Sequence, residues 1–327
     1  MQRTVLLTSI CLLSATLCEP ARAEWYTGER AVMGTRITVE LWGEDQTEAV
    51  RNIERVMQEM QRVDALMSTY KPTSQVSLVN ADAAKRPVTV DADLFGLLQT
   101  SLEYSQLTEG AFDITYASVG YLYDYRKGVR PTDAQIAAAL PAVSYRHVVL
   151  DAGKRTVRFT QPGVRIDLGG IAKGWAVDQG IEILRKAGVQ RAMVTAGGDT
   201  RIIGDRFGKP WMVGIRDPRE EGKVLVRIPL EDEALSTSGD YERFFEENGV
   251  RYHHILEPAS GKPARAVRSV TVIAPTATRT DGLSKTIFVL GIQKGMEVLD
   301  RLGDVDAIAI DAQGQIFYSR NLAQAAK

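Results

Sequence analysis

The spacing of hydrophobic and polar positions predicts a helix-rich N-terminal third. Alternation over 32–42 predicts a strand, and apolar residues every three or four positions over 44–67 predict a long amphipathic helix. The polar segment 68–74 ends that helix, because the residue before its proline is pushed away from helical geometry. A second helix is predicted over 91–108, with Asp91 as its N-cap.

From Arg146 onward the pattern changes to short alternating runs that predict strands. The expected strands are 147–150, 156–160, 191–195, 201–203, 211–215, 224–228 and 269–274. Near the end, helices are predicted over 282–290 and 294–302, followed by a hairpin of 307–310 with 316–318. Because no regular strand–helix–strand repeat is present, we expect an α+β fold with mixed sheets and a helix-rich N-terminal lobe.

One strand-to-helix junction carries both charged residues and glycines. Alternation over 164–168 predicts the strand, and helical spacing over 171–184 puts Gly169–Gly170 at the helix N-terminus. There the backbone N–H groups lack intrahelical partners and the helix dipole favours an anion, to which Lys173 can add positive charge. Asp167 would repel a bare phosphate, so a nucleotide with hydrogen-bond donors fits the junction better.

The same junction also has a plain structural explanation. Asp167 can cap the helix, Gly169–Gly170 can form a tight turn, and Lys173 can lie on a solvated face. The glycine spacing matches neither the phosphate loop nor the dinucleotide fingerprint. The junction alone therefore leaves a capped turn and a phosphate site equally open.

The N-terminus has the pattern of an export signal. Arg3 precedes an apolar stretch over 5–17, and Ala21–Ala23 forms a small-x-small cleavage site. An uncleaved membrane anchor is the alternative, but this stretch is short beside the ~20 residues that a membrane span needs. We expect residues 1–23 to be a signal peptide and residues 24–327 to form a periplasmic protein.

Cysteine content and charge exclude several function classes. Cys11 and Cys18 both lie in the predicted signal, so the exported protein would have no cysteine nucleophile and no cysteine-ligated metal. A lipid anchor on Cys18 is not expected, because Leu17 is larger than the small residue that precedes a lipidated cysteine. A formal net charge of −1 argues against a dedicated nucleic-acid binder.

Five further segments combine polar residues with turn glycines in a way that a plain scaffold does not require. They are Met33–Thr35, Gly110–Asp113, Ala196–Asp199, 253–261 and 280–286. Together with 165–178, and in this order, they resemble the ApbE family of FAD:protein FMN transferases. The patterns Asp-x-Gly-x-x-Ala-Lys-Gly and His-Ile-x-x-Pro-x-x-Gly are both present. The resemblance covers the exported chain and implies one ApbE-type domain over 24–327.

The resemblance implies an exported flavin transferase that uses FAD as its substrate. Such an enzyme attaches FMN through a phosphoester bond to a threonine or serine of a partner redox protein and releases AMP. Membrane association would come only through that partner, and no segment of this chain identifies it. The FAD contacts implied by the family motifs are Met33, Tyr70, Ala111, Phe112, Asp113, Asp167, Lys173 and the backbone near Ile255.

A magnesium site is also implied, and here the chain departs from the family. The Gly170 carbonyl and the Asp281 carboxylate would be ligands, but Lys285 replaces the family's threonine ligand four residues after the aspartate. Either magnesium remains bound by Gly170, Asp281 and water, or Lys285 partly or wholly replaces it. We expect Lys285 to pair with Asp281 and to replace the metal. Glu257 stands where the family usually has aspartate.

Transfer to a hydroxyl also needs a base. His254 is the first candidate, because histidine titrates near physiological pH, and Asp281 is the second; Lys285 would stabilise negative charge. His253 and His147 are expected to be structural. Two alternatives stay open: an FAD pyrophosphatase that gives FMN and AMP, and a flavin-binding protein without turnover.

Overall fold

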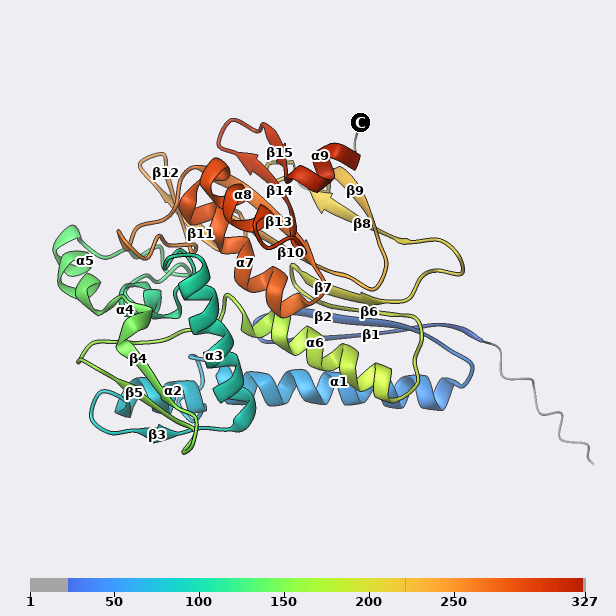
Figure 1. The fold of residues 1–327 in the computed structure, drawn as a ribbon, viewed down its shortest axis with the longest axis horizontal. Helices are drawn as coiled ribbons and strands as arrows, with labels where there is room; N and C mark the ends of the chain where they lie inside the picture. The colour runs from blue at the N-terminus through green and yellow to red at the C-terminus, as the bar shows by residue number, and fades with distance from the viewer. Residues whose placement is uncertain (1–22, 221, 326–327) are drawn as a thin grey trace, which may run out of the picture.

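A computed structural model describes residues 23–220 and 222–325, so the predicted signal peptide lies outside the described residues except for Ala23. An antiparallel sheet of eight strands forms the centre of the fold (Figure 1). In spatial order the strands are β1 (Glu24–Val32), β2 (Thr35–Gly43), β6 (Ala192–Ala196), β7 (Asp199–Ile203), β10 (Ala234–Gly239), β13 (Val267–Ala274), β14 (Asp306–Asp311) and β15 (Ile316–Tyr318).

Helices cover one face of this sheet and a hairpin covers the other. The helices are α1 (Gln46–Met67), α6 (Ala172–Lys186), α7 (Ala277–Leu290) and α8 (Ile292–Asp300). The hairpin consists of β8 (Trp211–Arg216) and β9 (Val224–Leu230), and the short helix α9 (Arg320–Ala325) follows β15. Adjacent Ile202 and Ile203 of β7 belong to different apolar clusters, as alternation across a sheet with two covered faces requires.

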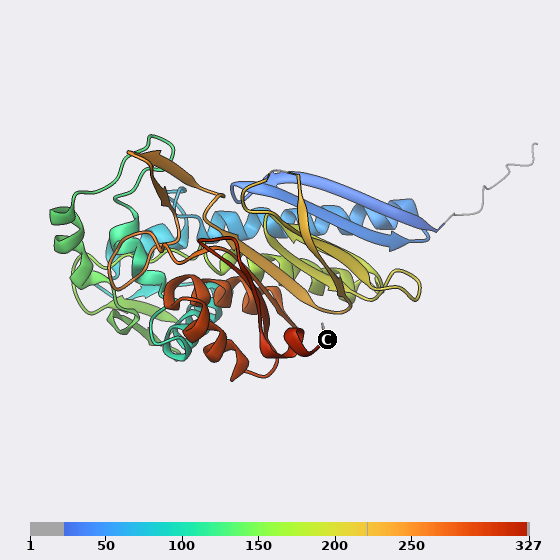
Figure 2. The same ribbon diagram turned by 90° about the horizontal axis from the view of Figure 1, so that it is seen from above.

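A second, helix-rich lobe lies beyond the end of this sheet (Figures 1 and 2). It contains α2 (Gln75–Asp82), α3 (Ala92–Leu107), α4 (Ala117–Gly120), α5 (Asp133–Ala139), and three 3₁₀ turns, η1 (Ile114–Tyr116), η2 (Leu140–Ala142) and η3 (Tyr145–His147). Its small sheet has β3 (Val88–Thr89), β5 (Thr156–Phe159) and β4 (Val148–Asp151), in that order. A separate ribbon pairs β11 (Phe244–Glu247) with β12 (Val250–His253).

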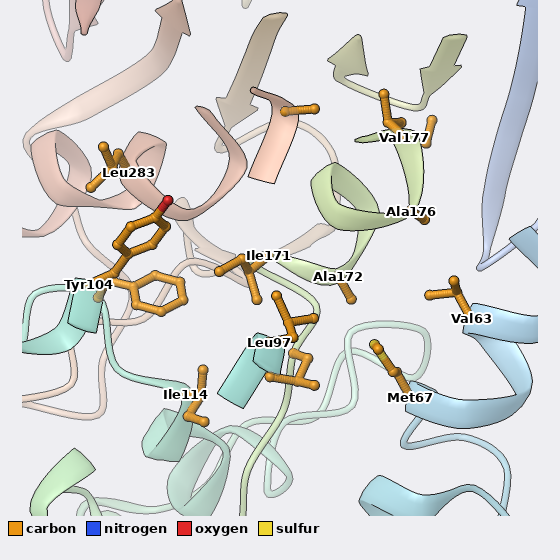
Figure 3. Packing of buried hydrophobic residues seen from close by; sticks show 14 of the residues in the cluster. Val63, Met67, Leu97, Tyr104, Ile114, Ile171, Ala172, Ala176, Val177 and Leu283 are labelled. Carbon is orange, nitrogen blue, oxygen red and sulfur yellow. The ribbon is translucent and has the colours of Figure 1, made fainter. Parts of the chain in front are cut away.

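One apolar cluster joins the two lobes. Figure 3 shows Val63 of α1, Leu97 of α3, Ala176 of α6 and Leu283 of α7 around the same space, with Ile171 between them. All five side chains are fully buried, and each such burial contributes about 1.5–3 kcal/mol for a residue of the size of valine or leucine. No described helix is long and apolar enough to span a membrane.

The predicted helices and the C-terminal hairpin are confirmed, whereas several elements escaped prediction. The prediction missed β1, α2, β3, α4, α5, β10, the ribbon β11–β12 and α9. It also placed the start of α7 at 282 instead of Ala277. Strand β1 shows only partial burial along its length, because it lies at the sheet edge. Its apolar and polar residues therefore alternate too weakly to be detected.

The predicted strand at 164–168 is wrong. This segment is extended and buried at alternate residues, but the structure assigns it to no sheet. The Asn80 amide hydrogen-bonds both the N–H (2.7 Å) and the carbonyl (2.9 Å) of Ile166, replacing the partners that a neighbouring strand would supply. Helix α6 also begins later than predicted, at Ala172, so Gly169–Gly170 form the turn before it.

Candidate functional site

Two hairpin turns meet at the end of the main sheet that faces the second lobe. The β1–β2 turn is Met33–Gly34, and both residues have positive φ, 56° and 71°. A side chain on Gly197, in the β6–β7 turn, would place its Cβ 2.7 Å from Thr35 Oγ1. The two turns are therefore in direct contact, and they bring Met33 and Asp199 to the same end of the sheet.

Helix α6, helix α7 and the start of strand β7 bring four charged side chains together beside these turns. The Lys173 ammonium lies 2.5 Å from Asp199 Oδ2 and 3.4 Å from Asp281 Oδ2. The Lys285 ammonium lies 2.5 Å from Asp281 Oδ1 and donates to the Asp281 carbonyl at 2.8 Å. We call Lys173, Asp199, Asp281 and Lys285 the lysine–aspartate cluster.

The helices can approach this closely because residue 174 is glycine. A Cβ on Gly174 would lie 2.1 Å from the Ala277 carbonyl oxygen and 2.8 Å from Asp281 Cβ. With no side chain there, the Gly174 N–H donates to Asp281 Oδ2 at 3.1 Å. The first turn of α6 thus hydrogen-bonds directly to the carboxylate carried by α7.

The cluster is buried and its charges stabilise one another. The Asp199 and Asp281 side chains are 3% and 1% exposed. Burial lowers the pKa of Lys173, but the carboxylates of Asp199 and Asp281 outweigh it and raise that pKa overall. Burial and the neighbouring Asp281 raise the pKa of Asp199, whereas the two lysines hold the pKa of Asp281 below its ordinary value despite its burial.

The implied magnesium ligands do not fit a metal in this arrangement. Both carboxylate oxygens of Asp281 already accept from ammonium or amide groups, and its carbonyl accepts from Lys285. The Lys285 side chain also passes Gly170, where a Cβ would lie 3.4 Å from Lys285 Cε. The expected Lys285–Asp281 ion pair is confirmed.

Asp167 satisfies the turn that precedes α6. Its Oδ1 accepts from the Gly169 N–H at 2.6 Å and its Oδ2 accepts from the Thr69 hydroxyl at 3.0 Å. The capped turn that the sequence left open is therefore present, although Asp167 caps the loop and not α6 itself. The neighbouring Tyr70 side chain is exposed, with 81% of its surface accessible, and is free to contact a ligand.

The Ala111–Asp113 step lies beside the turn that precedes α6. Ala111 and Phe112 are buried, and the Phe112 ring lies next to Gly170. Asp113 accepts from the N–H and hydroxyl of Thr115 and from the Tyr145 N–H, so its carboxylate caps η1. All three donors to the Asp113 carboxylate come from the protein itself. The predicted contact of Ala111–Asp113 with FAD would therefore come from backbone atoms of this segment, and it stays a prediction.

The histidines differ in their environments. His253 Nε2 contacts the Ala264 carbonyl at 2.5 Å, while Nδ1 accepts from the Ile255 N–H at 3.3 Å. Since the Ile255 carbonyl also accepts from Ala264, both backbone groups of Ile255 already have protein partners. His147 hydrogen-bonds the Thr160 side chain at 3.0 Å. His253 and His147 are thus structural, as expected.

His254 has a buried Nδ1 atom without a partner among the described residues. Burial, and then the positive charge of Arg243, lower the pKa of His254 to about 3. The ring is therefore neutral at physiological pH. A neutral imidazole with an unpaired nitrogen can accept a proton or hydrogen-bond a ligand.

Arg243 is a candidate that the sequence did not reveal. It is exposed, its Nη2 lies 3.6 Å from the position of a Cβ on Gly34, and its carbonyl accepts from the His254 N–H. Its guanidinium forms no ion pair within the described ranges. We call Arg243 and His254 the histidine rim. An arginine in a polar loop gives no sequence signal, because most such arginines are simply solvated.

Two other residues acquire defined roles. The Ser238 hydroxyl hydrogen-bonds Ser284 at 2.8 Å, and Ser284 donates to the Asp281 carbonyl at 2.8 Å, so Ser238 supports the cluster from β10. Asp240 instead forms a two-point ion pair with Arg219 at 2.8 and 2.7 Å. It stabilises the fold away from the lysine–aspartate cluster.

Comparisons with known proteins identify the family of this chain. The ApbE family model matches residues 33–309. The FAD:protein FMN transferase of Treponema pallidum is 33% identical over 309 residues, covering 89% of this chain and 85% of that protein. The Haemophilus influenzae enzyme of the same name is 37% identical over 250 residues, covering 73% of this chain and 72% of its own.

Solved structures show the same fold. The ApbE protein of Thermotoga maritima superimposes with a TM-score of 0.85 at 34% identity, covering 92% of this chain and 99% of that one. The flavin transferase ApbE of Vibrio cholerae gives 0.82 at 28% identity, covering 93% and 99%. The predicted α+β, ApbE-type fold is confirmed, and the chain belongs to the ApbE family of transferases.

Proposed function

We propose that this protein transfers the FMN half of FAD to a threonine or serine hydroxyl of a partner redox protein. The hydroxyl oxygen attacks the FMN phosphorus, a phosphoester bond forms, and the bond from that phosphorus to the bridging oxygen breaks. AMP leaves with the bridging oxygen. The main support is the buried lysine–aspartate cluster at the start of α6, in a chain of this family.

The cluster can stabilise the diphosphate and the charge that develops on the leaving AMP. Lys173 and Lys285 provide positive charge, and no side chain caps the N-terminus of α6, which favours an anion. Phosphoryl transfer requires little covalent participation of the protein beyond this charge stabilisation and alignment. Met33, Tyr70 and the Ala111–Phe112 step are proposed to hold the rest of FAD.

His254 is proposed to take the proton of the attacking hydroxyl. Its low pKa in the free protein makes it neutral but a weak base. An FAD diphosphate beside it would stabilise the protonated ring and raise its pKa, so substrate binding would make it a stronger base.

We also propose that the protein is exported and acts in the periplasm, with its signal peptide removed after Ala23. The basic residue, apolar stretch and small-x-small site at the N-terminus support this localisation. The acceptor is proposed to be an exported or membrane-bound redox protein, and the transferase would reach the membrane only through it.

The proposed function is tested by measuring AMP, free FMN and protein-bound flavin formed from FAD. The protein is incubated with FAD, with or without a redox protein that displays an Asp-containing motif ending in Ser or Thr. AMP release and protein-bound flavin that both require the acceptor are expected. AMP and free FMN without acceptor would assign a pyrophosphatase instead, and FAD binding without AMP would assign a flavin-binding protein.

A further inference from the structure

We infer that the Lys285 ammonium is a built-in cation that replaces magnesium, so that this chain acts on FAD without a divalent metal. The activity part of this inference rests on the proposed function, whereas the metal-binding part does not. Lys285 is one helical turn after Asp281, on the same side of α7. Its position is fixed by helix geometry and not by a flexible loop.

The ammonium is bound to one of the two remaining family ligands, Asp281, and its stem passes the residue that carries the other, Gly170. Its stem lies against Gly170 and its Nζ is 2.5 Å from Asp281 Oδ1. A magnesium ion on that oxygen would need a distance of about 2.1 Å, together with near-ideal octahedral geometry. An ion and the ammonium on the same oxygen would repel each other as like charges, so metal binding is opposed as long as Lys285 stays.

Displacement of Lys285 would be costly. Its side chain is 19% exposed, and it would give up the Asp281 carboxylate and carbonyl together. An ammonium without these partners would then lie beside a divalent cation of the same sign, and unpaired buried charge is strongly destabilising. The other Asp281 oxygen offers no easy alternative, because Lys173 and the Gly174 N–H hold it.

The charges of the cluster are already balanced. Two lysines face two aspartates within one buried group. A diphosphate that enters would meet Lys173 and Lys285, which share their carboxylates and keep ammonium hydrogens available for further bonds. The Lys285 ammonium can therefore donate hydrogen bonds to phosphate oxygens. In other members of the family, the metal would neutralise the same phosphate charge.

Two measurements on the wild-type protein test the inference. Titration with Mn²⁺ followed by electron paramagnetic resonance should show no binding that depends on Asp281, judged against Asp281→Asn. In the presence of FAD and the acceptor protein, AMP release after EDTA treatment should equal that with added Mg²⁺. Stoichiometric Mn²⁺ binding that Asp281→Asn removes, or activity that EDTA abolishes and Mg²⁺ alone restores, would overturn it. If no AMP forms in any condition, the proposed function fails while the Mn²⁺ titration still decides the inference.

Lys285→Thr restores the family's ligand and provides the converse test. This variant should gain Mn²⁺ binding, and its AMP release should become dependent on Mg²⁺ by about 100-fold, as expected for loss of a cation at a transferring phosphate. Lys294→Thr, on the exposed surface of α8, is the matched control and should behave like wild type. A Lys285→Thr protein that is folded by circular dichroism but binds no Mn²⁺ would contradict the inferred equivalence of ammonium and metal.

Discussion

The lysine–aspartate cluster and the histidine rim differ in how completely the protein itself satisfies their polar groups. Every charged group of the cluster has an opposite charge within 3.4 Å. The rim contains a guanidinium and an imidazole nitrogen without partners among the described residues. Folding alone therefore pairs every charge in the cluster. The polar groups of the rim would gain partners only when the substrate binds. Mutations in the cluster should lower stability, whereas mutations in the rim should lower the transfer rate or FAD affinity with little change in stability.

The largest effect is expected from Lys173→Met. It leaves the buried Asp199 carboxylate without its ion-pair partner and Asp281 with Lys285 alone. The free energy of unfolding should fall by about 3–5 kcal/mol, as for other broken buried ion pairs, and AMP release should be lost. Urea denaturation measures the change, with Lys294→Met as the control. Wild-type stability in Lys173→Met would mean that the cluster does not hold the two helices together.

His254→Ala should lower the rate of transfer and leave the stability of the protein nearly unchanged. Transfer to the acceptor should fall about 100- to 10,000-fold if His254 is the base, while FAD affinity and the free energy of unfolding change little. Single-turnover rates and FAD titration give the two quantities, and His147→Ala serves as control. Equal losses of rate and FAD affinity would make His254 a binding residue.

The low pKa of His254 also predicts how stability depends on pH. Above its ordinary value of 6.5 the ring is neutral in both states, so it adds no pH dependence. As the pH falls from 6.5 toward about 3, the unfolded chain takes up a proton that the folded protein refuses, and stability is lost. Between pH 7 and 5, wild type should lose roughly 1–2 kcal/mol more than His254→Asn. Parallel pH curves for the two proteins would disprove the shift.

Arg243→Ala should have the smallest effect. Its guanidinium is exposed and screened by water, so FAD affinity should fall only about fivefold, with no change in the free energy of unfolding. The loss should shrink as salt concentration rises. Arg158→Ala, on the exposed face of β5, is the control. Unchanged FAD affinity at low salt would remove Arg243 from the rim.

The sequence revealed what depends on local spacing. Helices α1 and α3 follow from their apolar periodicity, and Lys285 is one turn from Asp281 on any helix. The pairing of Lys173 with Asp199 could not be predicted, because only the contact between two hairpin turns and α6 brings them together. The wrong prediction of a strand at 164–168 also arises from a long-range contact. Asn80, 86 residues earlier in the chain, hydrogen-bonds the Ile166 backbone in place of a neighbouring strand.

Gly174 contributes to the site by lacking a side chain, because a Cβ there would clash with α7. The family motif places lysine and glycine next to each other, and here the lysine brings charge while the glycine removes an obstacle of a single carbon atom. Any larger residue would move α7 away from α6 and take Asp281 out of reach of Lys173. A designer who transplants this cluster into another helix pair must therefore copy a residue that has no side chain.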